Sequence, residues 1–193
     1  MSSRSTAGTT SARERVLDAA ADLFYRDGFV SVGVDTIVAE SGVAKMTLYR
    51  HFRSKDDLIV AYLERSNEQF WAWFENSLGQ GSPAEQLVHL FESLSEFTTS
   101  PQCFGGCMFQ HAAADFHKDH PAHRVAREHK TAVLARLLDL AKQAGAGEPR
   151  ALSAQLLLLM DGAFVAARIF GTRNPAVHVG RAAAALIKSQ ASG

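Results

Sequence analysis

Residues Gly28 to Leu63 read GFVSVGVDTIVAESGVAKMTLYRHFRSKDDLIVAYL and contain two short helical patterns separated by a turn. Apolar residues recur at helical spacing from Val34 to Val38, and this pattern ends at Gly42. Glycine accepts a positive φ at little cost, so the chain can turn sharply there and begin a second helix near Ala44. The segment therefore predicts two short helices joined by a tight turn.

The second helix is expected to bury only a narrow stripe. At 100° per residue, placing Leu48 inward brings Ala44 and Phe52 to within about 40° of it. The residues expected on the opposite, outward side are Met46, Tyr49, Arg50 and Arg53.

Positive charge is concentrated along this second helix. Between Gly42 and Lys55 the chain carries four bases and no acid, whereas its first sixty residues contain eight bases and eight acids. A basic face on the second of two short helices is typical of a helix-turn-helix, whose second helix fits a major groove about 12 Å wide. The residues alone leave open an ordinary solvated helix with incidental charge.

The flanking sequence is helical throughout. Ser11 and Glu14 have the spacing of a capping box, Gly28 ends the helix that they open, and Ser54 with Asp57 opens a long helix. After a break at residues 79–83, Gly and Pro residues separate further helical patterns. These patterns cover residues 84–98, 107–116, 122–144, 150–170 and 176–189.

No strand-like pattern competes with these helices, so we expect an all-α fold of about nine helices. A compact three-helix unit would be joined by a long fourth helix to a larger helical body. Residues 1–10 are polar and are expected to form a disordered arm. The expected bounds are residues 11–56 for the helix-turn-helix unit and residues 57–193 for the larger helical body.

Composition excludes several protein classes. The 193 residues balance 20 Lys and Arg against 20 Asp and Glu, with 47% hydrophobic and 21% charged residues, which excludes a mostly disordered chain and a chain-wide polycation. Two cysteines and no apolar N-terminal leader favour a cytoplasmic protein. Residues 151–170 are long enough to span a bilayer but include Asp161 and Arg168, which are costly in lipid, so we expect a buried helix and no membrane partner.

The stretch from Gly28 to Leu63 resembles the DNA-binding segment of the TetR family of transcriptional regulators. The resemblance fixes residue type and spacing over about thirty-five positions, which makes it far more specific than a short motif. The matching features are Gly28-Phe29, Ile37-Val38-Ala39, Ser41-Gly42-Val43, the run from Thr47 to Phe52 and the run from Ser54 to Leu58.

The resemblance implies a set of DNA-binding residues, while Leu48 and Phe52 would pack inward. Gly33 departs from the family, which usually has Thr or Ser there, so Ser31 or Thr36 is left as a source of a hydroxyl contact. Arg50 occupies a variable position and is expected to read a guanine. The DNA-binding candidates are Lys45, Met46, Thr47, Tyr49, Arg50, His51, Lys55 and Thr36.

The resemblance also implies a function, a ligand-responsive transcriptional regulator that is not an enzyme and needs no cofactor. A repressor is the preferred form, although activators also occur in the family. Residues 11–56 would be its DNA-binding domain and residues 57–193 its effector-binding and dimerisation domain. The regulator's expected partners are a double-stranded DNA operator, a small-molecule effector and a second copy that pairs through the last two helices. Small residues there allow close helix approach, although they are equally able to pack the monomer. These are Gly162, Ala163, Ala166, Ala167 and Ala182 to Ala185.

Candidates for the effector chamber are apolar and aromatic side chains of the body, which are also ordinary core residues. They are Phe70, Trp71, Trp73, Phe74, Phe91, Phe97, Phe104, Met108, Phe109, Phe116, Leu157, Met160 and Phe164. His111, Gln110 and Asp161 are sharper candidates because each needs a partner if buried. Asp161 has Arg168, a backbone turn or a partner subunit as alternatives to a ligand.

The body also contains candidates for a metal site and for a thiol sensor. His111, His117, His120, His123 and His129 lie near Asp and Cys residues, but Pro121 interrupts their helix and no pair has zinc-finger spacing, so we expect no metal. Cys107 near a helix N-terminus suits a thiol sensor, whereas its apolar neighbours favour inert burial beside Cys103. The rival functional classes are a helical metalloenzyme and a ligand carrier that retains a basic helix.

Overall fold

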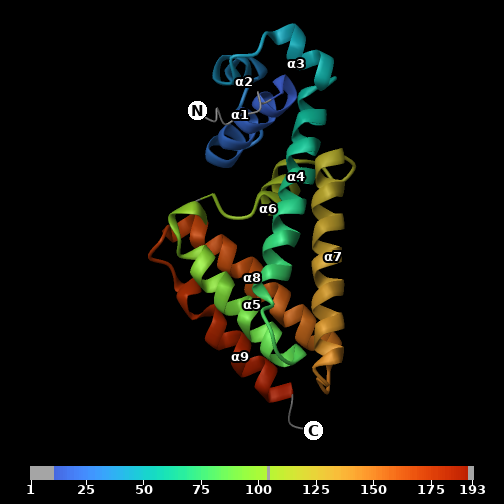
Figure 1. Cartoon of the computed structure of the whole chain (residues 1–193), viewed down its shortest axis with the longest axis vertical. Coiled ribbons are helices and arrows are strands. Elements are labelled where there is room, and N and C mark those ends of the chain that lie inside the picture. Colours follow the sequence, from blue (N-terminus) through green and yellow to red (C-terminus); the bar gives the residue numbers. More distant parts are fainter. Residues whose placement is uncertain (1–10, 104, 191–193) are drawn as a thin grey trace, which may run out of the picture. The chain divides into compact units, whose positions relative to one another are not determined.

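The computed structural model describes residues 11–103 and 105–190, so the expected arm at residues 1–10 and the candidate Phe104 lie outside the described residues. Within these ranges the chain forms nine α-helices and two short 3-10 turns, with no strand (Figure 1). The predicted all-α fold is confirmed. By packing, the chain divides into two compact units, Met1–Tyr62 and Leu63–Gly193.

The first unit contains α1 (Ala12–Asp27), α2 (Val34–Ser41), α3 (Lys45–His51) and the start of α4 (Lys55–Ser77). The predicted capping box opens α1, since the Ser11 hydroxyl accepts from the Glu14 N–H and the Glu14 carboxylate accepts from the Ser11 N–H. Gly28 ends the helix with a φ of 82°, a conformation that favours glycine.

Aromatic rings join the start of α4 to this first unit. The ring centroids of Phe24 and Phe29 are 5.3 Å apart, and those of Phe24 and Tyr62 are 5.8 Å apart. The division between the units therefore falls inside α4, after Tyr62. The end of the DNA-binding domain at residue 56 stays a prediction.

The second unit begins with the rest of α4 and continues through α5 (Pro83–Thr98) and four further helices. In Figure 1, α5 lies beside α8 and α9, and α7 lies along α4. Packing between α7 and α8 and between α6 and α7 completes the body. The remaining elements are η1 (Pro101–Cys103), α6 (Met108–Asp115), α7 (Pro121–Gln143), α8 (Pro149–Phe170), η2 (Pro175–His178) and α9 (Val179–Gln190).

Helix α8 is long and apolar enough to span a membrane, and core helices of soluble proteins share this length and composition. It packs against α5, α7 and α9, and Leu156, Met160 and Phe164 on it are buried. Its other face carries exposed Leu158 and Ile169. The helix therefore has one face in the core and one apolar face on the surface of this chain.

Candidate functional site

The turn between α2 and α3 depends on Gly42, which adopts a left-handed φ of 62°. A Cβ atom there would meet no atom within 4 Å, so the requirement for glycine is conformational rather than steric. The Ser41 hydroxyl donates to the Val38 carbonyl and accepts from the Val43 N–H. With Val43 buried, these bonds fix the direction in which α3 leaves the turn.

Beneath α3 lies a small apolar core. Leu48 and Ile37 are fully buried and Phe52 nearly so, and the Arg13 guanidinium lies 5.3 Å from the centre of the Phe52 ring. The predicted inward position of Ala44 is wrong, because Ala44 is the exposed N-cap of α3 with extended backbone angles. The preceding residue, Val43, fills the core in its place.

The outward face of α3 carries the side chains expected to bind DNA. Met46 is 71% exposed and Tyr49 is 42% exposed, which is unusual for such large apolar and aromatic side chains. Arg50 and His51 are exposed, and Thr47 is half-buried. The helix thus presents a mixed apolar and basic surface supported by a buried stripe.

Lys45 is held in place by an acid that the sequence analysis did not single out. Its Nζ atom lies 2.6 Å from a carboxylate oxygen of Asp35 on α2, and both side chains are exposed. The hydrogen bond to Asp35 raises the pKa of Lys45. The two residues are ten positions apart, so no helical spacing rule would have indicated the pair.

Lys55, at the start of α4, is directed back toward the loop before α2. Its Nζ donates to the Val30 carbonyl at 3.4 Å. Partial burial lowers the pKa of Lys55. The predicted cap of this helix is confirmed, since the Ser54 hydroxyl accepts from the Asp57 N–H at 3.0 Å.

The expected departure at Gly33 is confirmed, because this glycine is the N-cap of α2 and supplies no side-chain hydrogen bond. Of the two hydroxyls considered in its place, that of Ser31 donates to the Asp27 carbonyl. The Thr36 side chain is exposed on the first turn of α2. Thr36 is therefore the better placed of the two for a contact outside the chain.

Ten of the effector candidates in the body divide evenly into five buried and five partly accessible side chains. The buried ones are Phe74, Met108, Phe109, Met160 and Phe164. The partly accessible ones are Phe70, Trp73, His111, Leu157 and Asp161.

A row of ring contacts connects three helices of the body. The Phe70 and Trp73 centroids of α4 are 5.6 Å apart, Trp73 lies 5.9 Å from Phe97 of α5, and Phe97 lies 6.2 Å from Phe164 of α8. Whether this row lines an effector chamber stays a prediction.

The polar candidates of the body have partners within it. The Asp161 carboxylate forms an ion pair with Lys130 of α7, so the alternative pairing with Arg168 is wrong. Arg168 instead lies 2.7 Å from Nδ1 of His111 through its Nη1 atom. Gln110 donates to the Asp161 carbonyl at 3.2 Å, which ties α6 to α8.

His129 of α7 is more deeply buried than any of the polar candidates. Its side chain is 3% exposed, and Nδ1 lies 2.7 Å from the Asn67 side-chain oxygen of α4. Nε2 is buried and has no partner among the described residues. The sequence placed His129 in a histidine-rich region but gave no sign of this environment.

The histidine-rich region and the two cysteines were also considered as a metal site and a thiol sensor. Within 11–103 and 105–190, no group of three or more His, Cys, Asp or Glu side chains is arranged to hold a metal ion. Cys103 and Cys107 are buried free thiols. The burial of Cys107 does not suit the exposed thiolate that a thiol sensor needs.

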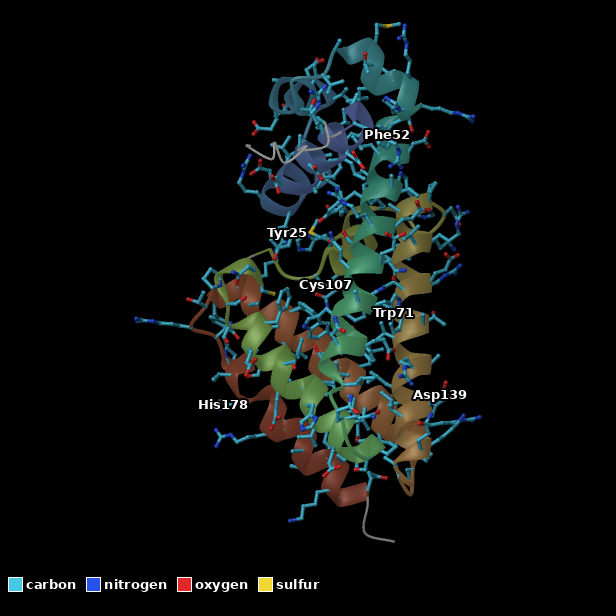
Figure 2. All side chains as sticks on the ribbon, viewed as in Figure 1. Tyr25, Phe52, Trp71, Cys107, Asp139 and His178 are labelled. Atoms are coloured by element: carbon cyan, nitrogen blue, oxygen red, sulfur yellow. The ribbon has the colours of Figure 1, made fainter. Side chains whose placement is uncertain are left out.

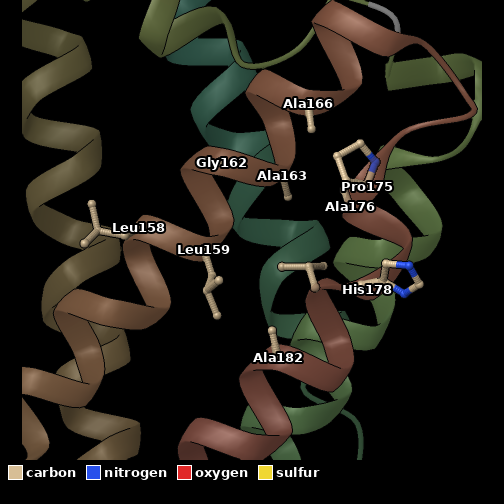
Figure 3. A pocket seen from close by; sticks show the side chains of 10 residues that line it. Leu158, Leu159, Gly162, Ala163, Ala166, Pro175, Ala176, His178 and Ala182 are labelled. Carbon is tan, nitrogen blue, oxygen red and sulfur yellow. The ribbon is translucent and has the colours of Figure 1, made fainter.

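An apolar hollow of about 250 Å³ lies between α8 and the segment formed by η2 and α9 (Figure 3). Leu158, Gly162 and Ala166 line its α8 side, and Pro175 and Ala182 line the other. Close to it, large apolar side chains are exposed in this single chain. They are Leu158, Val165, Ile169, Phe170 and Val177.

Comparison with known proteins matches each of the two units to a model of the same protein family. The sequence model described as bacterial regulatory proteins, tetR family, matches residues 16–62. The model described as tetracyclin repressor-like, C-terminal domain, matches residues 83–183. A crystal structure of a TetR-family transcriptional regulator from Streptomyces coelicolor is similar with a TM-score of 0.82 and 34% identity, covering 93% of this chain and 94% of that one.

Curated relatives match over shorter stretches. The transcriptional activator FasR of Mycolicibacterium smegmatis is 42% identical over 53 residues, which cover 28% of this chain and 24% of that protein. The transcriptional repressor ComR of Escherichia coli K12 is 30% identical over 97 residues, covering 49% of this chain and 46% of the relative. The chain thus spans less than half the length of these curated relatives.

Proposed function

The chain belongs to the TetR family of bacterial transcriptional regulators with a helix-turn-helix DNA-binding domain, and on this premise we propose that it is a homodimeric, effector-responsive repressor. Two copies hold their α3 helices in successive major grooves of an operator, about 34–36 Å apart. A small molecule bound in the helical body favours a state in which that spacing no longer fits. The protein acts in the cytoplasm, where its operator is.

The observation that carries the DNA-binding role is the exposed face of α3. Arg50 can donate two hydrogen bonds to a guanine, the commonest specific contact in the major groove. Met46 offers the apolar surface that a thymine methyl group favours. Lys55 contributes a charge for the phosphate backbone, and its attachment to the Val30 carbonyl keeps that charge close to the end of α3.

Dimerisation is supported by the exposed apolar face of α8. Leu158, Val165 and Ile169 are spaced by seven and four residues, so they lie on one side of the helix. A second copy that packs its own α8 and α9 against this face removes these side chains from water, which is favourable. The hollow beside them, lined by small residues, leaves room for close approach of a partner helix.

Repression is the proposed direction of control. ComR, the repressor among the relatives, aligns over 97 residues, which is longer than the first unit of this chain. The activator FasR aligns over only 53 residues. A reporter gene placed behind the operator tests the direction: expression that rises when the regulator gene is deleted supports repression, and expression that falls overturns it.

DNA binding is tested with a duplex selected from a random pool by the full-length chain. Fluorescence anisotropy then compares Arg50→Ala with Arg127→Ala, a matched change at an exposed arginine of α7. Arg50→Ala is expected to lose about 1–3 kcal/mol of binding and to relax preference at one base pair, while Arg127→Ala binds normally. Equal binding by both variants would contradict the assigned role of α3.

A further inference from the structure

Half of the hydrogen-bonding capacity of the His129 imidazole is unused. The ring is almost fully buried, its Nδ1 faces the Asn67 amide oxygen at 2.7 Å, and its Nε2 has no partner among the described residues. An amide oxygen only accepts hydrogen bonds, so Nδ1 carries the proton and Nε2 presents a lone pair. A buried acceptor of this kind calls for a donor.

The imidazole is neutral, which restricts the donor that suits it. Burial lowers the pKa of His129 to about 3, and the neighbouring Lys130 charge acts in the same direction. At neutral pH Nε2 therefore accepts and does not donate. The neighbouring Lys130 ammonium is already paired with the Asp161 carboxylate, so this cation is not available to an anionic ligand.

Aromatic rings pack against the His129 imidazole. Phe109 of α6 stacks on the imidazole with centroids 3.6 Å apart, and Phe70 of α4 meets it edge-on at 4.6 Å. Trp71 lies on α4, beside α7 (Figure 2), and the centroid of its ring is 6.5 Å from that of His129. Such rings favour flat, apolar partners.

Some of this aromatic surface is accessible, although the rings lie in a packed body. Phe70, Trp71, Trp73 and Phe97 are partly exposed, whereas Phe109 is buried. The ring contacts described above lead from His129 through Phe70 and Trp73 to Phe97. An unpartnered acceptor thus lies at one end of a row of partly uncovered rings.

We propose that the effector is an uncharged aromatic molecule whose hydroxyl or N–H group donates a hydrogen bond to Nε2 of His129. This inference rests on the proposed function, since it assigns the chemical class of the effector. The rings supply the apolar contact area, and Nε2 of His129 selects molecules that carry a donor. Carboxylates and molecules that only accept hydrogen bonds are discriminated against, because they leave Nε2 unsatisfied.

The test uses two matched pairs of probes and the full-length chain in calorimetric titrations. 2-Naphthol and p-cresol carry a hydroxyl donor, and their methyl ethers, 2-methoxynaphthalene and 4-methylanisole, do not. At least one phenol is expected to bind about tenfold more tightly than its ether, as the loss of one buried hydrogen bond predicts. Equal affinity within both pairs, tighter binding of 2-naphthoate, or binding of none of the probes would overturn the proposal.

His129→Phe separates a hydrogen bond from a packing role. This variant keeps a flat ring but removes the acceptor, so phenol affinity should fall to that of the ether while ether affinity stays unchanged. If His129→Phe weakens phenol and ether alike, the residue only shapes the site and the proposal fails.

Nitrogen chemical shifts of the imidazole give a readout that packing alone would not move. With ¹⁵N-labelled histidine, His129 should show the tautomer protonated on Nδ1, and adding the bound phenol should shift the Nε2 resonance. A proton on Nε2 would overturn the proposal, as would a bound phenol that leaves Nε2 unshifted.

The same samples distinguish this inference from the proposed function. If the chain binds its selected duplex but prefers the ethers, the assignment of the effector class fails and the regulator role stands. If the phenols bind through His129 but the duplex is never bound, the regulator role fails instead.

Discussion

The two units of this chain place their candidate functional side chains in opposite environments. In the first unit, Met46, Tyr49 and Arg50 are exposed on a short helix that rests on buried Leu48. In the second, His129 and its neighbours are enclosed by rings from α4 and α6. A binding surface for a large polyanion must be accessible, whereas a site for a small molecule gains from burial.

This contrast predicts how substitutions behave. Changes on the outer face of α3 should alter binding while leaving folding almost unaffected, because exposed side chains contribute little to stability. Changes in the enclosed cluster should alter folding and ligand binding together, because they leave cavities or unsatisfied polar groups.

The largest expected effect comes from removing the support of either unit. Leu48→Ala and Leu137→Ala each truncate a fully buried leucine, one in each unit. Each should cost about 2–5 kcal/mol of unfolding free energy, and each should act on its own unit. Hydrogen exchange measured at increasing temperature reports the stability of each unit separately. Equal loss of protection in both units for either variant would contradict the expectation that each substitution acts on its own unit.

The next effect is the pH dependence of the enclosed cluster. Because the folded pKa of His129 is depressed to about 3, the unfolded chain binds the extra proton first, so stability is complete above about pH 6.5 and falls as pH decreases toward 3. At pH 5 the loss from this group should be about 2 kcal/mol. Burial lowers the pKa of His111 too, which adds in the same direction.

Urea unfolding at pH 7.5 and pH 5 measures that loss. His129→Phe has no proton to gain, so its pH dependence should be shallower, with a remainder from His111. His117→Gln, at an exposed histidine of the same unit, is the control for loss of a surface histidine. An unchanged dependence in His129→Phe would show that the imidazole is not desolvated.

A smaller effect is expected for Lys55, which we propose to contact the phosphate backbone of DNA. Lys55→Ala should weaken binding to any duplex by about tenfold and reduce the slope of log affinity against log salt by about one. The matched control is Lys118→Ala, at an exposed lysine of the other unit. Anisotropy titrations at several salt concentrations measure this slope. An unchanged slope would show that Lys55 does not contact the DNA phosphates.

The smallest predicted change concerns the ion pair between Asp35 and Lys45. Asp35→Asn removes an exposed negative charge and releases Lys45 from its 2.6 Å contact. Affinity for unrelated duplexes should rise by about two- to threefold, with little change in melting temperature, because exposed pairs contribute little to stability. A weakened affinity would indicate that Asp35 holds Lys45 in its DNA-binding position.

Sequence reasoning served the first unit well because its determinants are local. The cap at Ser11, the stop at Gly28, the turn at Gly42 and the cap at Ser54 each depend on residues a few positions apart. The error at Ala44 has a local cause as well, since helical periodicity was extended one residue past the true start of α3. Which of the exposed residues bind DNA stays a prediction.

The body was predictable only in its helices. Proline at the start and glycine between patterns marked α5, α7 and α8. The contacts of the candidate site instead join residues far apart in sequence, such as Asn67 with His129. Such pairs depend on how helices pack in three dimensions, and a single sequence contains no pattern that indicates them.

Photo-crosslinking can show where this chain meets DNA and where it meets a second copy, because Met46 on α3 and Leu158 on α8 are both 71% exposed. Each is replaced in turn by p-benzoylphenylalanine, and the full chain is irradiated with its selected duplex. We predict a DNA adduct from position 46 and a covalent dimer of the chain from position 158. A DNA adduct from position 158, or none from position 46, would contradict the assignment of α3 to DNA and of α8 to the second copy.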